Sequence, residues 1–256
     1  MKLFYPLAKR FIAGHDFDSA KPVIADLMEQ GYGVTIDYLG ELSKTIDDCE
    51  KATKQYLDII EYYKNSSIDI SIKPTQLGLK LDKEKCFELL LRITSQARQY
   101  GLTIRLDMED FSVTQDTIDM CLRIWKKNPN IGIALQSNLY RTTNDLPKLM
   151  SRGISIRLIK GAYKEDITKS YQRNNLKVKS FLRLAQTLLS NNGKSYFHFL
   201  NNVKHAIGTH DETIIKSIKT QLPVFKVKPT DFQFELLYGI RRDISFSLLK
   251  EGYNVT

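Results

Sequence analysis

The chain has 256 residues, enough for one domain of ordinary size with a buried core. It carries 38 Lys and Arg against 29 Asp and Glu, a formal net charge of +9. The basic residues are scattered over predicted helices with no dense block, which favours a solvated surface over a nucleic-acid site. No linker, repeat or low-complexity tract interrupts the sequence. We therefore expect a single domain over residues 1–256, with a helical lead-in over about residues 1–31.

The N-terminal segment Met1–Arg10 has charges at both ends of a very short apolar run. That run is too short for a signal-peptide core or a membrane span, so the sequence predicts a cytosolic protein. An amphipathic lead-in of this kind leaves room for peripheral contact with the inner face of a membrane. Cys49, Cys86 and Cys121 lack C-x-x-C spacing and fall in helical patterns, so we expect buried free thiols. The histidine spacing predicts no metal site.

Helical and strand patterns alternate along the chain. In chain order, we expect a helix at 21–30, a strand at 34–37, a helix at 44–64, a strand ending at 73, a helix from an Asp82 cap to before Gly101, a strand at 103–108, a helix at 114–127, a strand at 131–136, a helix at 144–150, a strand at 154–159, a helix at 164–190, a strand from 205, a strand at 231–236 and a helix at 243–250. Residues 195–202 fit neither pattern, and an eighth strand begins at Tyr253. Strands separated by helices indicate parallel pairing with right-handed crossovers.

Polar side chains stand where five of these strands end. In a barrel of parallel strands such ends converge on one rim, where functional groups are presented. The groups are Lys73, the pair Asp107 and Glu109, Gln136, the run Arg157 to Tyr163, and Thr209-His210-Asp211.

Lys73 requires a partner of opposite charge at this rim, because an isolated buried ammonium is costly. Asp107 is the natural candidate, one strand away. The residues leave two interpretations open: an internal ion pair that fixes strand ends, or a polar pair that orients a substrate. Asp107 and Glu109 share a strand face with Arg105, so salt bridges to Arg105 would explain both carboxylates equally well. Gly161 has no Cβ and allows close approach of a ligand or another backbone.

Several segments resemble the proline dehydrogenases, and the ordered set covers nearly the whole chain. The matching segments are Ile72-Lys-Pro-Thr-Gln-Leu-Gly78, Arg105-Leu-Asp-Met-Glu-Asp110, Gln136 with Leu139-Tyr-Arg-Thr142, Arg157-Leu-Ile-Lys-Gly-Ala-Tyr163 and Gly208-Thr-His-Asp211, with Arg10-Phe-Ile-Ala-Gly14, Asp37-Tyr-Leu-Gly-Glu41 and Phe232-Gln-Phe-Glu-Leu-Leu-Tyr-Gly239 in support. The resemblance implies an α/β (βα)8 TIM-type barrel. It also implies oxidation of L-proline to 1-pyrroline-5-carboxylate, with hydride transfer to FAD and electrons passed to a quinone-type acceptor.

The resemblance assigns roles residue by residue. It places Lys73, Asp107, Leu158 and Tyr163 at the substrate. It places Gln136, Arg157, Ile159, Lys160, Gly161, Ala162, Thr209 and His210 at the cofactor. Leu158 and Arg157 are adjacent on the strand, so their side chains are expected to point to opposite faces. An irregular strand end would be needed for both to face the site. No G-x-G-x-x-G motif occurs, which argues against a Rossmann site; a barrel flavoprotein does not require one.

The departure from the family lies at the C-terminal end. The family carries a tyrosine on its last strand, and an Arg-Arg pair with a nearby Glu on its last helix; that pair clamps the proline carboxylate. Arg241-Arg242 follows the seventh strand and is not in the matching place. The sequence therefore predicts a barrel without its last helix and most of its last strand, with open edges on the first and seventh strands. It leaves an alternative open: a flavin-binding barrel whose proline turnover is impaired.

Overall fold

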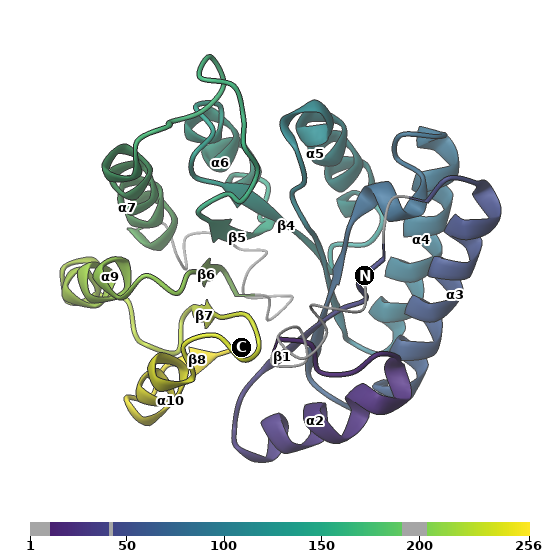
Figure 1. Ribbon diagram of the computed structural model, residues 1–256, viewed down its shortest axis with the longest axis horizontal. Coiled ribbons are helices and arrows are strands. Elements are labelled where there is room, and N and C mark those ends of the chain that lie inside the picture. Colours follow the sequence, from purple (N-terminus) through teal and green to yellow (C-terminus); the bar gives the residue numbers. More distant parts are fainter. Residues whose placement is uncertain (1–10, 41–42, 191–203) are drawn as a thin grey trace, which may run out of the picture.

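The computed structural model describes residues 11–40, 43–190 and 204–256. Eight parallel strands form one sheet in sequential order from β1 to β8, with helices around it (Figure 1). The strands are β1 (Val34–Asp37), β2 (Ile68–Ile72), β3 (Thr103–Leu106), β4 (Ile131–Gln136), β5 (Ser155–Ile159), β6 (Ala206–Gly208), β7 (Gln233–Glu235) and β8 (Asn254–Val255). The α/β barrel topology predicted from the sequence is confirmed.

The helices alternate with the strands, and a short 3₁₀ helix follows β2. They are α2 (Phe17–Glu29), α3 (Ile46–Tyr62), η1 (Pro74–Leu77), α4 (Lys83–Gln99), α5 (Phe111–Trp125), α6 (Thr142–Met150), α7 (Asn174–Ser190), α9 (Glu212–Phe225) and α10 (Arg242–Lys250). Asp82 caps α4 as expected, accepting hydrogen bonds from the backbone N–H groups of Glu84 and Lys85. In the part of the chain that the structure describes, no helix has the length and apolar character that crossing a membrane requires.

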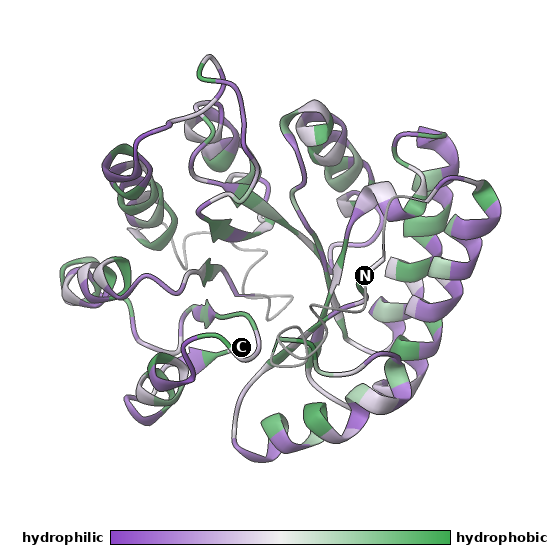
Figure 2. Cartoon of the chain, viewed as in Figure 1, coloured by the Kyte–Doolittle hydropathy of each residue, from purple (hydrophilic) through white to green (hydrophobic). Residues whose placement is uncertain are grey.

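The main hydrophobic core lies between the strands and the helices. Alternate strand residues such as Ile70, Ile104, Ile133 and Ile156 are fully buried there, and Figure 2 shows the central strands largely in the hydrophobic colour. The other strand face encloses the barrel interior, because side chains on non-neighbouring strands meet across it. Arg105 on β3, for example, contacts Ser155 on β5. The fold therefore turns one strand face to the apolar core and the other to a polar interior.

Two helix predictions need correction. The helix expected from residue 164 begins at Asn174, ten residues later. The preceding segment is tied instead to the loop after β4, where Tyr140 N–H donates to Lys169 O and Tyr171 N–H donates to Asn138 O. Helix α9 was not predicted at all, although Asp211 caps it and its Ile and Leu residues have helical spacing.

The eighth strand is present as β8, which changes the expected arrangement where the last strands of the barrel meet the first. Val255 pairs with Phe234 of β7, and its carbonyl accepts a 2.8 Å hydrogen bond from Gly33 N–H, just before β1. The expectation of an open edge on β7 is therefore wrong over these residues, and one backbone hydrogen bond links the first and last strands. The predicted lead-in at residues 1–10 and the unassigned residues 195–202 lie outside the described residues.

Candidate functional site

A chain of ion pairs with alternating sign runs through the barrel interior to the carboxyl ends of the strands. Along it each charge lies next to one of opposite sign, which is what burial of charged groups requires. We call this set the charge chain; in order it comprises Asp69, Arg105, Glu235, Arg157, Asp107, Lys73 and Asp37.

Its inner part is the most deeply buried. Arg105 is only 1% exposed and lies 3.7 Å from Asp69 and 3.8 Å from Glu235. Gly132 on β4 gives it room: a Cβ there would come 2.8 Å from Ser155 O and 3.4 Å from Arg105 Nη1. No ion pair joins Arg105 to Asp107 among the described contacts, so the expected salt bridge to Arg105 is replaced by pairs deeper in the barrel.

Lys73 follows β2 and points to a carboxylate on each side. Its ammonium lies 2.7 and 2.9 Å from the two oxygens of Asp37, and 3.8 Å from Asp107. The main partner is therefore Asp37, the last residue of β1, rather than the expected Asp107. Burial alone would lower the pKa of Lys73, but the charges of Asp37 and Asp107 outweigh it and raise that pKa above its usual value. Lys73 is accordingly a fixed cation at neutral pH.

Asp107 joins the two sides of the rim. It accepts hydrogen bonds from Ser71 Oγ at 3.0 Å and from Arg157 Nη1 at 2.8 Å. Burial raises the pKa of Asp107, an effect that the charge of Arg157 opposes. Glu109, two residues on, turns away to bind the backbone and hydroxyl of Thr75 at the start of η1. The two carboxylates therefore have separate roles.

Arg157 is held from two directions. Nη1 donates to Ser71 and Asp107, both at 2.8 Å, while Nε pairs with Glu235. Burial would lower the pKa of Arg157, but the Glu235 and Asp107 carboxylates raise it. The guanidinium is thus a permanent, oriented cation that projects from the middle of β5.

Lys160 and Gly161 begin the loop after β5. Lys160 Nζ pairs with Asp211 at 2.8 Å, and this hydrogen bond is the main reason that the pKa of Asp211 is lowered. Gly161 has a φ of +98°, and a Cβ on it would lie 2.1 Å from Asn138 Oδ1, so only glycine fits this turn. The turn packs directly on the Asn138 amide.

Two buried amides beside this turn have polar atoms without a hydrogen-bond partner. Gln136 is 1% exposed; its Nε2 donates to Glu109 O, whereas its Oε1 has no partner. Asn138 is also 1% exposed, and neither of its amide atoms has a partner. Unpaired buried polar groups are costly and call for an explanation, and a polar cofactor is one. These amides and the Arg157 and Lys160 cations together offer hydrogen-bonding groups and positive charge to a polar, negatively charged cofactor.

The remaining candidates are spread around the rim. Tyr163 is 41% exposed, and partial burial, then the charge of Glu109, raises its pKa. Ile159 is partly buried and Ala162 is exposed. Leu158 is fully buried in the hydrophobic core on the strand face opposite Arg157, so the structure does not bring it to the cluster.

Thr209 and His210 follow β6. Thr209 is buried, and its hydroxyl accepts from Asp211 N–H at 3.1 Å. His210 Nε2 accepts from Leu237 N–H at 2.8 Å, so this nitrogen is occupied by the loop after β7. Burial and the charge of Arg241 lower the pKa of His210, which favours the neutral ring. Only its Nδ1 is left for a ligand.

Residues of this site that were not predicted include Asp37, Glu235 and Asn138. Asp37 and Glu235 stand at strand ends within segments that match the family, so the strand-end rule could have found both. Nothing in the sequence marks Asn138, because its importance depends on the packing of Gly161. Arg241, as expected, does not join the cluster; it pairs with Asp243 and Glu212.

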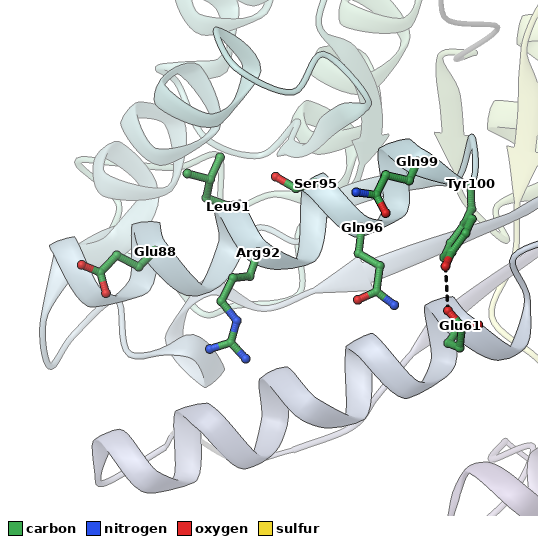
Figure 3. A pocket seen from close by; sticks show the side chains of 8 residues that line it. All are labelled: Glu61, Glu88, Leu91, Arg92, Ser95, Gln96, Gln99 and Tyr100. Atoms are coloured by element: carbon green, nitrogen blue, oxygen red, sulfur yellow. Dashed lines mark hydrogen bonds between the residues drawn. The ribbon is translucent and has the colours of Figure 1, made fainter.

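A surface hollow of about 760 Å³ lies away from the rim, along the outer face of α4 and the end of α3 (Figure 3). Most of its lining residues are of polar types, and Tyr100 Oη donates to Glu61 at 2.8 Å across it. None of the predicted site residues lines it; its residues are Glu61, Glu88, Leu91, Arg92, Ser95, Gln96, Gln99 and Tyr100. The candidate site is therefore the rim at the strand ends and not this hollow.

Comparison with known proteins shows the family of the chain. The family model described as Proline dehydrogenase matches residues 20–256. The chain belongs to the proline dehydrogenase family. Proline dehydrogenase 2 of Bacillus subtilis strain 168 is 31% identical over 250 residues, which cover 97% of this chain and 79% of the relative. Proline dehydrogenase of Deinococcus radiodurans is 32% identical over 257 residues, with the same coverage of each chain.

The fold of the family is confirmed by solved structures. Proline utilization A from Bdellovibrio bacteriovorus, crystallised after inactivation by N-propargylglycine, superimposes with a TM-score of 0.86 at 19% identity. The match covers 98% of this chain and 30% of that longer protein. At this identity the likeness shows the barrel fold, and the rest of that protein has no counterpart in the match.

Proposed function

We propose that this protein is an FAD-dependent oxidoreductase that converts L-proline to 1-pyrroline-5-carboxylate. Membership of the proline dehydrogenase family supports the reaction. The observation that carries the assignment to this rim is the contact of Asp107 with Arg157, at 2.8 Å. It joins a lysine–carboxylate cluster suited to an amino acid to an arginine suited to a flavin.

The cofactor would lie over the ends of β4, β5 and β6. Gln136 and Asn138 would satisfy their unpaired amide atoms on polar atoms of the flavin. Arg157 and Lys160 would supply positive charge to the flavin and its phosphates, and the turn at Gly161 would allow close approach. When bound, FAD accepts a hydride from the carbon next to the ring nitrogen of proline and passes electrons to a quinone-type acceptor.

The substrate amine must lose its proton before oxidation, and the structure favours a carboxylate for this task. Lys73 is held protonated by Asp37, so it is a poor proton acceptor. Asp107 lies beside it, and burial raises the pKa of Asp107 toward the range in which a carboxylate can accept a proton. We therefore assign Lys73 the role of orienting the substrate and Asp107 that of biasing the amine toward its neutral form.

Flavin binding is tested first, by adding FAD to the purified chain and measuring the absorbance that remains after desalting. A yellow protein with flavin bound noncovalently is expected. A folded protein that stays colourless after incubation with FAD would refute the proposal. If flavin binds but L-proline does not reduce it, the flavin-binding barrel without turnover replaces the enzyme.

A further inference from the structure

Glu235 is a buried carboxylate that contacts both arginines of the barrel interior. It stands at the end of β7 and is 9% exposed. One carboxylate oxygen pairs with Arg157 Nε, and the other lies 3.8 Å from Arg105 Nη2. Gln233 Nε2 also donates to this second oxygen at 2.7 Å. Neither the family segments nor the comparisons assign Glu235 a role.

The contacts of Glu235 and Asp107 together fix the plane of the Arg157 guanidinium. Asp107 and Ser71 hold Nη1 from the side of β2 and β3, while Glu235 holds Nε from the side of β7. A guanidinium is planar, so an ion pair at Nε together with hydrogen bonds at Nη1 restricts its rotation more than the Nη1 contacts alone. Without Glu235 only the Nη1 contacts would remain, and the group could turn about them.

Burial of the Glu235 carboxylate has a desolvation cost, which its ion pairs and hydrogen bond offset. A buried carboxylate is unfavourable unless it is paired and hydrogen-bonded. Burial would raise the pKa of Glu235, but the charges of Arg157 and Arg105 outweigh burial and lower it. Glu235 therefore stays ionised within the interior, where its charge and its geometry both act on Arg157.

We propose that Glu235 is a positioning residue that fixes the Arg157 guanidinium in the orientation required beside the flavin. The inference rests on the proposed function, because Arg157 faces a flavin only if FAD binds at this rim. A fixed cation beside the flavin stabilises the negative charge that arrives on reduction, and the effect depends on its placement. Positioning of Arg157 is therefore expected to control the flavin midpoint potential.

Two other roles for Glu235 would give different results. If it acts only through its negative charge, replacement by another carboxylate will leave the potential unchanged. If it serves only to stabilise the barrel, replacement will lower the melting temperature without moving the potential. Glu235→Asp keeps the charge but shortens the reach by one methylene, whereas Glu235→Gln keeps the reach but removes the charge. This pair of variants separates the three roles.

Asp69→Asn supplies the matched control. Asp69 belongs to the same charge chain and lies 3.7 Å from Arg105, but no hydrogen bond or ion pair joins it to Arg157 among the described contacts. Its replacement removes a neighbouring negative charge without removing a contact of Arg157.

The experiment is a redox titration of the FAD-loaded protein, with the rate of flavin reduction by L-proline measured alongside. Positioning predicts that Glu235→Asp shifts the midpoint potential to more negative values and slows flavin reduction on the order of tenfold, with KM for proline little changed. Glu235→Gln should shift the potential to more positive values, and Asp69→Asn should shift it only slightly in that direction. An unchanged potential in Glu235→Asp would overturn the proposal.

A second readout needs no cofactor. In the unliganded protein, the side-chain N–H resonance of Arg157 in a ¹⁵N NMR spectrum should be protected from exchange by the ion pair with Glu235. It should lose protection in Glu235→Asp and keep it in Glu235→Gln and Asp69→Asn. Equal protection in all four proteins would contradict positioning, whereas failure of the wild-type chain to bind FAD would contradict only the proposed function.

Discussion

The two sides of the barrel build the rim in different ways. On the side of β1 to β4 the strands have four to six residues, and α3 and α4 have 17 residues each. On the side of β6 to β8 the strands have three, three and two residues. Figure 1 shows this contrast between the long strands near β4 and the short arrows of β6 to β8.

The two sides also supply different functional groups to the rim. The long-stranded side supplies Asp37, Lys73 and Asp107, which ion pairs hold at the ends of regular strands. The loops after β5 and β6, which border the short-stranded side, supply Lys160, Asp211 and His210, and these residues in part bind other loops. We infer that the ends of β1 to β3 are built to orient a small substrate, and that the ends of β4 to β6 are built to hold a larger cofactor. Asp107 and Arg157 join the two.

The largest effect is expected for Lys73→Ala, which should leave flavin content unchanged while slowing flavin reduction by L-proline on the order of hundredfold. The reason is that Lys73 belongs to the substrate side, and its removal leaves Asp37 without a partner. Flavin absorbance per protein and stopped-flow reduction measure the two quantities. Lys83→Ala is the control, because Lys83 makes an exposed pair with Asp116. Loss of flavin with an unchanged reduction rate per bound flavin would break the division between the two sides.

The opposite pattern is expected for Lys160→Ala on the cofactor side. It should weaken FAD binding on the order of tenfold, the value of one charge-assisted contact, and leave the reduction rate per bound flavin nearly unchanged. Fluorescence titration of the unliganded protein with FAD gives the affinity. Lys216→Ala removes an exposed lysine paired with Glu212 and should have no effect. An affinity equal to that of the wild-type protein would remove Lys160 from the cofactor site.

Asn138→Leu should separate stability from cofactor binding. Both amide atoms of Asn138 are buried without partners, so a leucine of similar shape should leave the free energy of unfolding of the unliganded protein unchanged or raise it. FAD binding should weaken. Asn128→Leu is the matched control: Asn128 donates to Thr94 and Ser95, and its loss should cost about 1–3 kcal/mol of stability without an effect on FAD affinity. Equal destabilisation by the two substitutions would show that Asn138 has a partner within the protein.

The smallest expected effect is the contribution of His210 to the pH dependence of folding stability. The pKa of His210 is lower in the folded protein than in the unfolded chain, where it is about 6.5. At a pH between these two pKa values, the unfolded chain therefore binds more protons than the folded protein. The stability contributed by the neutral ring is therefore complete above about pH 6.5 and is lost as the pH falls toward the folded pKa. His210→Gln should lack this dependence. Melting temperatures of both proteins at several pH values test the difference, and parallel curves would contradict it.

The same contrast explains what could be predicted from the sequence. On the long-stranded side, the bounds of the first strand and the Asp82 cap were correct, because regular strands and capped helices leave strong periodic signals. On the other side, the start of α7 was wrong and α9 was missed, because loop contacts such as Tyr171 with Asn138 have no local signature. The strand-end rule identified Lys73, Asp107 and Arg157. It could not show that Asp37 is the nearer partner of Lys73, because only the register between β1 and β2 sets that distance.

The most direct test of the whole account is anaerobic addition of L-proline in large excess to the FAD-loaded protein, followed by flavin absorbance. We predict that the oxidised flavin band disappears with L-proline and that a quinone added afterwards restores it. A flavin that stays oxidised with L-proline, in a protein whose flavin dithionite still reduces, would contradict the claim that this rim oxidises proline.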